Sequence, residues 1–588
     1  MRLGAPLGDF SVSRTTVRFG EFELDQNAGE LCRDGSKIRL QEQPLQILRI
    51  LLEQPGRVVP REELQKRIWP SDTFVDFDHG INNAIKRLRE ALSDTAETPR
   101  YVETLPRRGY RFIGKIERET PKFRSLAVLP LENLSRDPEQ EYFADGLTEA
   151  LITSLAKVSA LRVVSRTTAM RYKGAHRPLP EIARELQVDG IVEGTVLRSG
   201  ERVRISAQLI EARTDMHLWA ESYERDLRDM LTLHSEVARA IAKEIQITLT
   251  PREQMQLGAS RSVDPEGYEA YLKGRHHWNK RTPVEVKKGA EYFQQAVEKD
   301  PTYAAAYAGL ADIAGIAGFY GFASPTEGCG RAKAAARKSL EIEETAEARA
   351  SLGWAIMHYD WDFLVAEKEF RRAFELNPRY ATAHQWYGHC LGYMGRFDES
   401  FAELKHAIQL EPLSLIINTS YAGLLWLARR WDQAIEQCQK TLELDANFQP
   451  AQWILGQAYD SKGIPEAAIA LLQKLVKASG GAVIYLTRLG HAYATAGRSD
   501  EARRVVRQLQ EFSKQGYVMA YWMAYVFTNL NEKDEAFRWL EKAYEERSAW
   551  MASFKMDPWF DDLRSDPRFQ DLLRRMNFPV EIGSRRKQ

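Results

Sequence analysis

Apolar and polar residues follow three different patterns along the 588 residues of the chain. Between residues 15 and 118, short runs with an apolar residue at every second position, such as "VRFGEFELD", precede segments with apolar residues three or four positions apart. Between residues 125 and 250, apolar runs alternate with helical periods, and from about residue 265 the helical period continues almost to the end. These periods predict a small α+β domain, an α/β domain and an all-helical region.

The helical region repeats every 34 residues. Small residues recur at that interval, and a second set of small residues follows twelve positions after the first. Small residues let two antiparallel helices approach closely, and such pairs bury their apolar faces by stacking on neighbouring pairs. The pattern resembles the tetratricopeptide repeat (TPR), which implies a solenoid over residues 265–575, clearest at 381–550. The two sets are Gly388, Ala422, Gly456, Gly490 and Ala524, and Ser400, Ala434, Ala468, Ala502 and Ala536.

The middle block, residues 125–250, follows a polar linker at 117–124. It opens with the apolar strand "SLAVLPLENLS" and the amphipathic helix "EQEYFADGLTEALITSLAKV". Two alternating runs joined by the turn "RSGER" then predict a hairpin. This order resembles the TolB-type N-terminal α/β domain, and the resemblance implies a fold rather than an activity.

The third predicted helix of the first domain has two unlike faces. At 100° per residue, Ile81, Ile85, Leu88 and Leu92 cluster on one side. The opposite side is polar, and asparagine and arginine there can pair with base edges while lysine and arginine neutralise phosphates. The polar side consists of Asn82, Asn83, Lys86, Arg87, Arg89 and Glu90.

Charge is polarised within this domain although the whole chain is neutral, with 82 basic and 82 acidic residues. Residues 81–115 carry eight basic and four acidic side chains, a local net charge of +4. Residues 71–80, "SDTFVDFDHG", contain three aspartates and neither lysine nor arginine. A basic surface confined to one side is what a DNA footprint requires.

Two segments, "INNAIKRLREAL" and "YVETLPRRGYRFIG", resemble the third helix and wing of the OmpR/PhoB-type winged helix-turn-helix, over residues 15–116. The resemblance implies that the third helix enters the major groove of duplex DNA and that the wing contacts the minor groove or backbone. Pro106-Arg107-Arg108 departs from the Val-Arg-Gly that the family often has. The predicted DNA-binding residues are Asn82, Asn83, Lys86, Arg87, Arg89, Arg107, Arg108 and Arg111.

Some residues of the wing have a second interpretation. Arg111 can contact phosphate or pair with Glu103 across the hairpin. Tyr110 and Phe112 are expected in the core at the base of the wing rather than between bases.

Members of this family carry a phospho-accepting receiver before the domain or a membrane span after it. About 15 residues precede the domain here, and "KIERETPKFRS" is too polar to cross a bilayer. Only four cysteines, far apart, and no signal peptide predict a reducing compartment. We therefore expect a cytoplasmic, one-component arrangement without a membrane partner.

Three functional hypotheses follow. The first is a sequence-specific transcriptional regulator whose partners are double-stranded DNA, a protein or peptide on the TPR array, RNA polymerase and a second copy on DNA. The second is a TPR scaffold whose winged helix docks protein. The third is an enzyme using Asp145, Glu149 or Asp189, but no paired constellation, Walker A, GxSxG or HExxH motif accompanies them. We expect no enzymatic activity, cofactor or metal site.

Overall fold

The computed structural model of the chain describes residues 16–25, 29–33, 36–69, 77–118, 123–135, 137–175, 177–245, 247, 249–258, 262–278, 283–514 and 516–578. The chain divides into two compact units, Met1–Lys122 and Phe123–Gln588. Most of the predicted linker at 117–124 therefore lies at this division, and its residues 119–122 fall outside the described ones. The predicted domain boundaries remain predictions.

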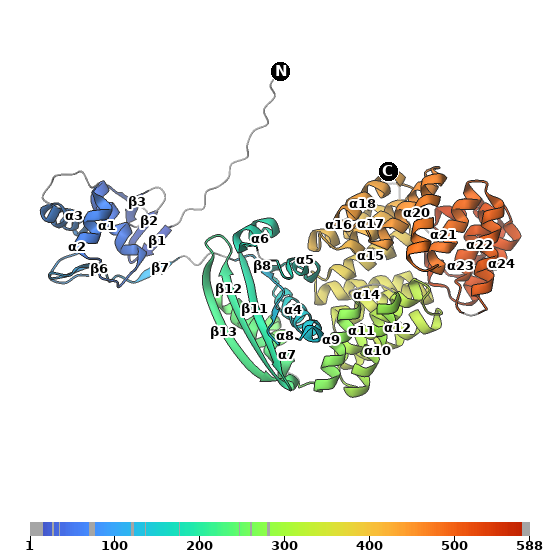
Figure 1. Cartoon of the computed structure of the whole chain (residues 1–588), viewed down its shortest axis with the longest axis horizontal. Coiled ribbons are helices and arrows are strands. Elements are labelled where there is room, and N and C mark those ends of the chain that lie inside the picture. Colours follow the sequence, from blue (N-terminus) through green and yellow to red (C-terminus); the bar gives the residue numbers. More distant parts are fainter. Residues whose placement is uncertain are drawn as a thin grey trace, which may run out of the picture. The chain divides into compact units, whose positions relative to one another are not determined.

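The first unit combines a sheet, three helices and a hairpin (Figure 1). Strands β1 (Thr16–Phe19), β2 (Phe22–Asp25), β3 (Glu30–Arg33) and β4 (Ser36–Ile38) precede helices α1 (Glu42–Glu53), α2 (Arg61–Ile68) and α3 (Phe77–Ala91). Strands β5 (Val102–Leu105), β6 (Gly109–Phe112) and β7 (Ile116–Arg118) follow.

The two ends of this unit meet in one antiparallel sheet. Its order is β4-β3-β2-β1-β7, so the strand after the hairpin returns to pair with the first strand. Phe19, Phe22, Tyr101 and Phe112 pack with ring centroids 5.1–6.3 Å apart beneath the helices. This aromatic core joins the base of the hairpin to the sheet. It forms on the one buried face that the alternating apolar and polar residues of the strands predict.

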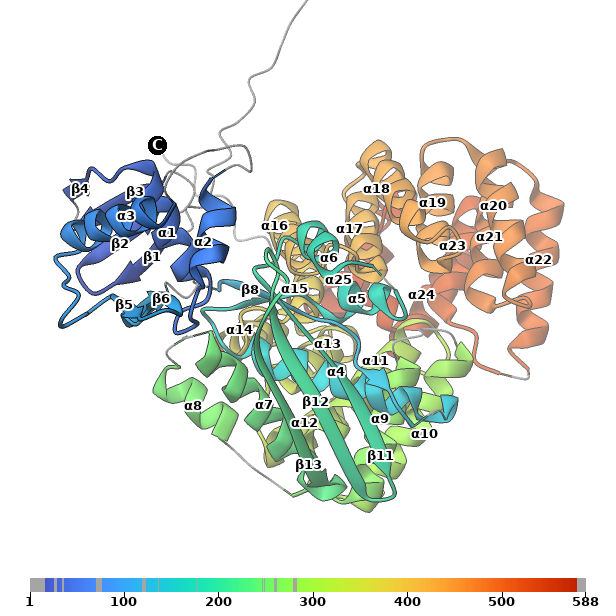
Figure 2. The ribbon, with the colours of Figure 1, turned by 60° about the vertical axis from the view of Figure 1, so that its left-hand side comes forward.

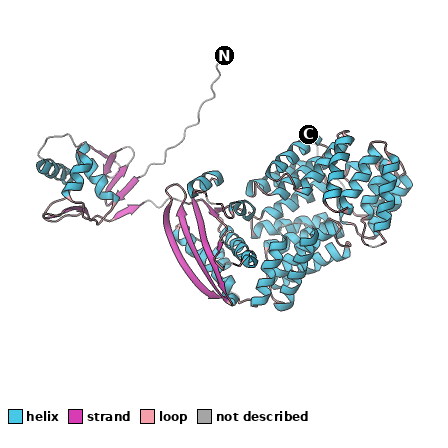
Figure 3. Ribbon diagram, in the orientation of Figure 1, coloured by secondary structure: helices cyan, strands magenta, loops and turns pink. Residues whose placement is uncertain are grey.

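The second unit begins with a mixed sheet of order β10-β8-β11-β12-β13, to which β9 adds beside β11 (Figures 2 and 3). The central β8 is parallel to β10 and β11, whereas β11, β12 and β13 form an antiparallel meander. The strands are β8 (Ser125–Val128), β9 (Glu132–Asn133), β10 (Arg162–Val163), β11 (Gly190–Ser199), β12 (Arg202–Glu211) and β13 (Met216–Asp226).

Helices cover both faces of β8. Leu126 and Val128 pack with α4 (Glu141–Ala156) and α7 (Met230–Glu244), and Ala127 packs with α6 (Leu179–Leu186). Because side chains alternate between faces along a strand, a strand covered on both sides is apolar at every position. This explains why "SLAV" forms an uninterrupted apolar run, and the predicted α/β fold is confirmed.

A helical array completes the second unit. Its helices pair as α9 (Pro265–Trp278) with α10 (Pro283–Lys299), and so on to α23 with α24 (Figure 1). The helices after α10 are α11 (Ala304–Phe319), α12 (Arg331–Ile342), α13 (Ala346–Ala355), α14 (Phe363–Leu376), α15 (Ala381–Tyr393), α16 (Phe397–Leu410), α17 (Leu415–Leu427), α18 (Trp431–Leu444), α19 (Gln449–Ser461), α20 (Pro465–Ala478), α21 (Val483–Thr495), α22 (Ser499–Phe512), α23 (Ala520–Asn529) and α24 (Lys533–Glu545).

The small residues of the 34-residue period lie where the paired helices cross. A Cβ added to Gly388 would come within 2.7 Å of Leu404 on the second helix of its pair. Ser400 on that second helix is fully buried and donates a hydrogen bond of 2.7 Å to the Gly388 carbonyl. The predicted TPR solenoid is confirmed, because close approach of the helices requires these small side chains.

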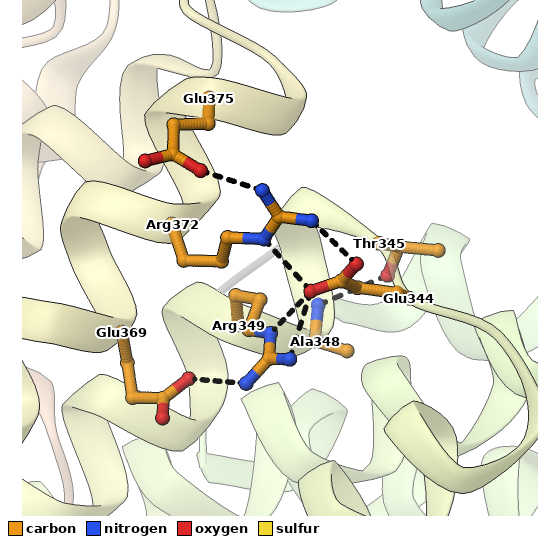
Figure 4. A network of polar contacts seen from close by, with 7 residues as sticks. All are labelled: Glu344, Thr345, Ala348, Arg349, Glu369, Arg372 and Glu375. Carbon is orange, nitrogen blue, oxygen red and sulfur yellow. Dashed lines mark hydrogen bonds and ion pairs between the residues drawn. The ribbon is translucent and has the colours of Figure 1, made fainter.

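Ion pairs reinforce the outer surface of the array. Glu344, between α12 and α13, accepts from Arg349 at 2.8 Å and from Arg372 on α14 at 2.7 Å (Figure 4). Arg349 also pairs with Glu369, and Arg372 with Glu375. Hydrogen bonds from Arg372 and Arg349 lower the pKa of Glu344 to about 2.

The array is joined to the α/β domain by a partly buried ion pair. Arg275 on α9 donates a hydrogen bond of 2.8 Å to Glu149 on α4, and Glu149 also forms an ion pair with Arg166, with Nε and Oε2 3.0 Å apart. Removing one member of this partly buried pair leaves an uncompensated charge, so the contact helps to hold the two parts together. Within the described part of the chain, no helix is long and apolar enough to cross a membrane.

Candidate nucleic-acid interface

The predicted third helix is α3, and its two faces are as expected. Ile81, Ile85, Leu88 and Leu92 are each at most 2% exposed in the core of the first unit. Asn82, Asn83, Lys86 and Arg87 are exposed on the opposite face. The helix therefore rests its apolar stripe on the domain and presents its polar stripe to solvent.

The wing is the hairpin of β5 and β6. Val102 pairs with Phe112 and Leu105 with Gly109, which leaves exposed Pro106, Arg107 and Arg108 at the tip. Gly109 has a φ of +135°, and a Cβ there would lie 2.1 Å from the carbonyl oxygen of Val59. Only glycine fits so close to another backbone, which fixes where the wing leaves the domain.

Tyr110 and Phe112 are buried at the base of the wing, as predicted. Val59, before α2, forms an isolated bridge with Tyr110. The base of the hairpin is thereby anchored while its tip stays in solvent.

Four of the predicted DNA-binding side chains are exposed to solvent. Within the described residues, the side chains of Lys86, Arg87, Arg107 and Arg108 have no hydrogen-bond or ion-pair partner. Unpaired cations in water are available to neutralise phosphates at little desolvation cost. Their role in binding DNA remains a prediction.

Arg89 differs from these four because it is half-buried and engaged within the domain. Its Nη2 donates to the Val102 carbonyl and to Thr104 Oγ1, each at 2.8 Å. It therefore ties α3 to β5, and this geometry supports a role in positioning the helix against the wing. The predicted contact of Arg89 with DNA is untested.

Arg111 pairs with Glu103, the residue directly opposite on the hairpin. This is the second of the two interpretations considered for Arg111. The guanidinium retains partial exposure, and its predicted DNA contact is likewise untested.

Asn82 belongs to a network that joins three elements. Its Oδ1 accepts from Tyr110 Oη at 3.0 Å and from Arg61 Nη2 at 2.9 Å. The same Arg61 nitrogen lies 2.8 Å from Tyr110 Oη, and its guanidinium lies 5.3 Å from the Tyr110 ring. The network connects α2, α3 and β6 at the exposed surface.

Sequence reasoning missed Arg61. The available signal was its place at the first position of α2, directly after Pro60, where a side chain projects from the helix end. Nothing local indicated that it would meet Asn82, 21 residues away.

The carboxylates considered for catalysis all have local partners. Asp145 accepts from Lys173 at 2.5 Å, and Glu149 belongs to the pair with Arg275. Asp189 accepts from the backbone N–H groups of Arg124 and Ser125 at 2.8 and 2.9 Å. Each therefore takes part in holding strands or helices together. Over the described residues, no group of three or more His, Cys, Asp and Glu side chains is placed to hold a metal ion.

Family models match three parts of the chain. Residues 35–112 match "Transcriptional regulatory protein, C terminal", and residues 122–243 match "HilA/YgeH-like transcriptional regulator, second domain". Residues 381–412 and 428–483 match tetratricopeptide repeats. The TolB-type resemblance of the middle domain stays a prediction beside the HilA/YgeH match.

Curated relatives match parts of the chain. Putative adenylate cyclase 3 of Rhizobium meliloti is 40% identical over 196 residues, which is 33% of this chain and 33% of that protein. Transcriptional regulator HilA of Salmonella typhi is 23% identical over 409 residues, or 68% of this chain and 71% of that protein.

Among solved structures, the Klebsiella pneumoniae RstA DNA-binding domain in complex with RstA box is 27% identical. The match covers 17% of this chain and 96% of that chain, with a TM-score of 0.15. Together, the family matches and the fold assign to this chain an OmpR/PhoB-type DNA-binding domain, a HilA-like second domain and a C-terminal TPR array.

Proposed function

We propose that this protein is a sequence-specific, DNA-binding transcriptional regulator of the one-component type. The observation that carries the proposal is the shared surface of α3 and the wing, with exposed Asn83, Lys86 and Arg87 on the helix and Arg107 and Arg108 at the tip. The family match over residues 35–112 and the name of the HilA relative support it.

The binding mode follows from chemistry. Lys86, Arg87, Arg107 and Arg108 neutralise phosphates and set the register of the domain on the duplex. Asn83 reads a base edge, because its amide can donate and accept at once and pairs with adenine. Arg89, Arg111 and Asn82 contribute contacts from positions that the domain already holds in place.

The experiment uses the full chain and a pool of duplexes carrying a randomised central segment. Selection followed by a salt titration is expected to enrich one motif and to give a binding constant that falls linearly with salt on logarithmic axes. Recovery of unenriched sequence, or binding that salt does not weaken, would contradict the proposal.

The TPR array supplies a protein- or peptide-binding module that acts as input or recruits transcription machinery. We propose RNA polymerase as one partner, a cytoplasmic location, and two copies on half-sites about one helical turn apart. A mobility-shift titration with half-site spacing varied in single base pairs tests the last point, since affinity should peak near one turn.

The alternative is a scaffold whose winged helix docks protein. The TPR array would serve that role equally well, but a helix face of asparagine and basic side chains beside a basic hairpin tip favours a polyanion. The same selection experiment separates the two, because a protein-docking winged helix enriches no DNA sequence.

A further inference from the structure

The inner face of the TPR array is covered by the chain's own C-terminal segment. Successive first helices of the pairs, from α11 to α23, contact one another and form this face. After α24, the 3-10 helices η6 (Ala549–Ser553) and η7 (Pro558–Leu563) lie against it. We call residues 549–563 the plug.

The plug reaches helices that are distant in the sequence. Trp550 stacks on Phe319 of α11 with centroids 4.9 Å apart and donates to its carbonyl at 2.7 Å. Trp559 stacks on His491 of α21 at 3.6 Å and donates to Ser461 of α19 at 3.1 Å. The plug therefore spans the repeats and occupies the surface on which TPR proteins are expected to bind a partner.

The chemistry of the plug is acidic and aromatic, "DPWFDDL" at residues 557–563. Asp557 is fully buried and accepts hydrogen bonds from the hydroxyls of Tyr521 and Tyr525 on α23. At the margin, Asp561 accepts two hydrogen bonds from Arg429, at 2.5 and 3.0 Å. The array thus offers aromatic walls, two hydroxyl donors and a basic margin.

Arg488, beneath the plug, is a buried charged group whose side chain makes no hydrogen bond to the described residues. Arg488 of α21 is 1% exposed, and none of its three side-chain nitrogens has a hydrogen-bond partner within the described part of the chain. Five rings surround its guanidinium at 4.5–5.7 Å; Trp453, Trp522 and Tyr525 belong to the array, and Trp550 and Trp559 to the plug.

A buried guanidinium without a hydrogen bond loses its hydration, and ring contacts recover only part of that loss. Burial also raises the pKa of the Asp557 carboxyl, and the tyrosine hydroxyls and the charge of Arg488 only partly offset that cost. The closed arrangement is therefore less stable than its apolar contacts alone would make it. Asp557 interacts with Arg488 through its charge but accepts no hydrogen bond from it, so a segment that brought a carboxylate within hydrogen-bonding distance of Arg488 would reduce this penalty.

We propose that the inner face of the array is a groove for acidic, aromatic peptide segments, that the plug occupies it in cis, and that a partner segment of similar chemistry displaces the plug. This rests on the proposed role of the array as a protein-binding module. It adds the chemistry of the partner, a tryptophan or phenylalanine flanked by aspartates, and an internal competitor that the partner must replace.

The test uses a fluorescent peptide of residues 547–578 and three forms of the protein. They are the full chain, the full chain with Trp559→Ala and Asp561→Arg, and a chain ending at Glu546. Fluorescence anisotropy is expected to give at least tenfold tighter binding to the two altered forms than to the full chain. A peptide carrying Trp559→Ala should bind at least tenfold more weakly than the unaltered peptide.

Two controls separate plug release from general damage. Glu532→Arg breaks the exposed pair with Arg503 on α22, outside the plug, and should leave peptide affinity as in the full chain. The full-length double variant serves if the truncated chain does not fold, and circular dichroism verifies its helix content.

The proposal is overturned if the folded double variant binds no peptide at tens of micromolar. Equal hydrogen-exchange protection of residues 549–563 and of α21 and α23 in that variant would show the plug to be a permanent part of the core. DNA binding by the same proteins is measured in parallel. A failure of the proposed DNA-binding function is thereby distinguished from a failure of the proposed peptide groove.

Discussion

Arginine side chains that make no hydrogen bond to the described residues occur in both units of this protein, in opposite surroundings. Arg107 and Arg108 at the wing tip are exposed, whereas Arg488 in the array is 1% exposed. In water an unpaired guanidinium keeps its hydration and is free to meet a phosphate. In the core the same group has lost its hydration and interacts with ring faces and with the charge of the buried Asp557 carboxylate. An unpaired charge indicates a polyanion-binding surface in the first case and an unstable contact in the second.

The largest expected effect tests the buried side of this comparison. Arg488→Met keeps the length of the side chain but removes the positive charge that interacts with the buried Asp557 carboxylate, so we expect the free energy of unfolding to fall by about 3 kcal/mol. Arg488→Lys should lower the free energy of unfolding by about 1–2 kcal/mol. An ammonium is more strongly hydrated than a guanidinium, and it has no planar face that could stack on the rings. Urea denaturation followed at 222 nm measures both. A more stable Met variant would mean that the desolvation of the guanidinium outweighs its interactions with Asp557 and the rings.

The exposed side is tested by Arg107→Ala combined with Arg108→Ala. We expect a 10- to 100-fold loss of affinity across all duplexes and a decrease of about 2 in the salt slope, since each phosphate contact contributes about 0.9. The matched control is Lys37→Ala with Arg39→Ala, two exposed basic residues in and beside β4 of the same unit. An unchanged salt slope in the wing variant would remove the tip from the interface.

A smaller effect separates positioning from base reading on α3. Asn83→Ala should cost about 1–2 kcal/mol at one base pair and little elsewhere. Asn82→Ala should weaken binding to all sequences by similar amounts, because it breaks the network with Arg61 and Tyr110. Binding to a panel of single-base operator variants measures both. A uniform loss for Asn83→Ala would argue against base readout.

The smallest effect concerns arginines that are paired on the surface. Arg349 and Arg372 hold the pKa of Glu344 at about 2, below its ordinary 4.5. A depressed pKa contributes stability above pH 4.5 that is lost as the pH falls towards 2. Glu344→Gln should therefore lower stability by less than about 1 kcal/mol at pH 7, because the group is partly exposed. Thermal melts at pH 7, 4 and 2.5 should show that the difference in stability between the variant and the wild type disappears as the pH falls. A difference that stays constant with pH would exclude the ion pairs as its cause.

Much of the interface could be predicted because its signals are local. The stripe of Ile81, Ile85, Leu88 and Leu92 fixes which face of α3 is buried, and therefore which face carries Asn83 and Arg87. The hairpin follows from alternating residues around "LPRRG". Arg89 shows the limit of such reasoning, because a helical wheel places it beside Lys86 and Arg87, while the structure has it donating to β5. Only the packing of the wing against α3 brings those atoms together.

Periodicity by itself determined the three classes of fold, the crossing points of the helix pairs and the polar face of α3. Each depends on residues within a few turns or one repeat of each other, where backbone geometry dictates which side chains share a face. Tertiary structure alone decided that Arg61 donates a hydrogen bond to Asn82. It also decided that Trp550 donates one to the carbonyl of Phe319, 231 residues earlier. It also decided that the inner face of the array is already filled. Contacts over such separations arise from how the solenoid curves back on itself, and no local pattern records that curvature.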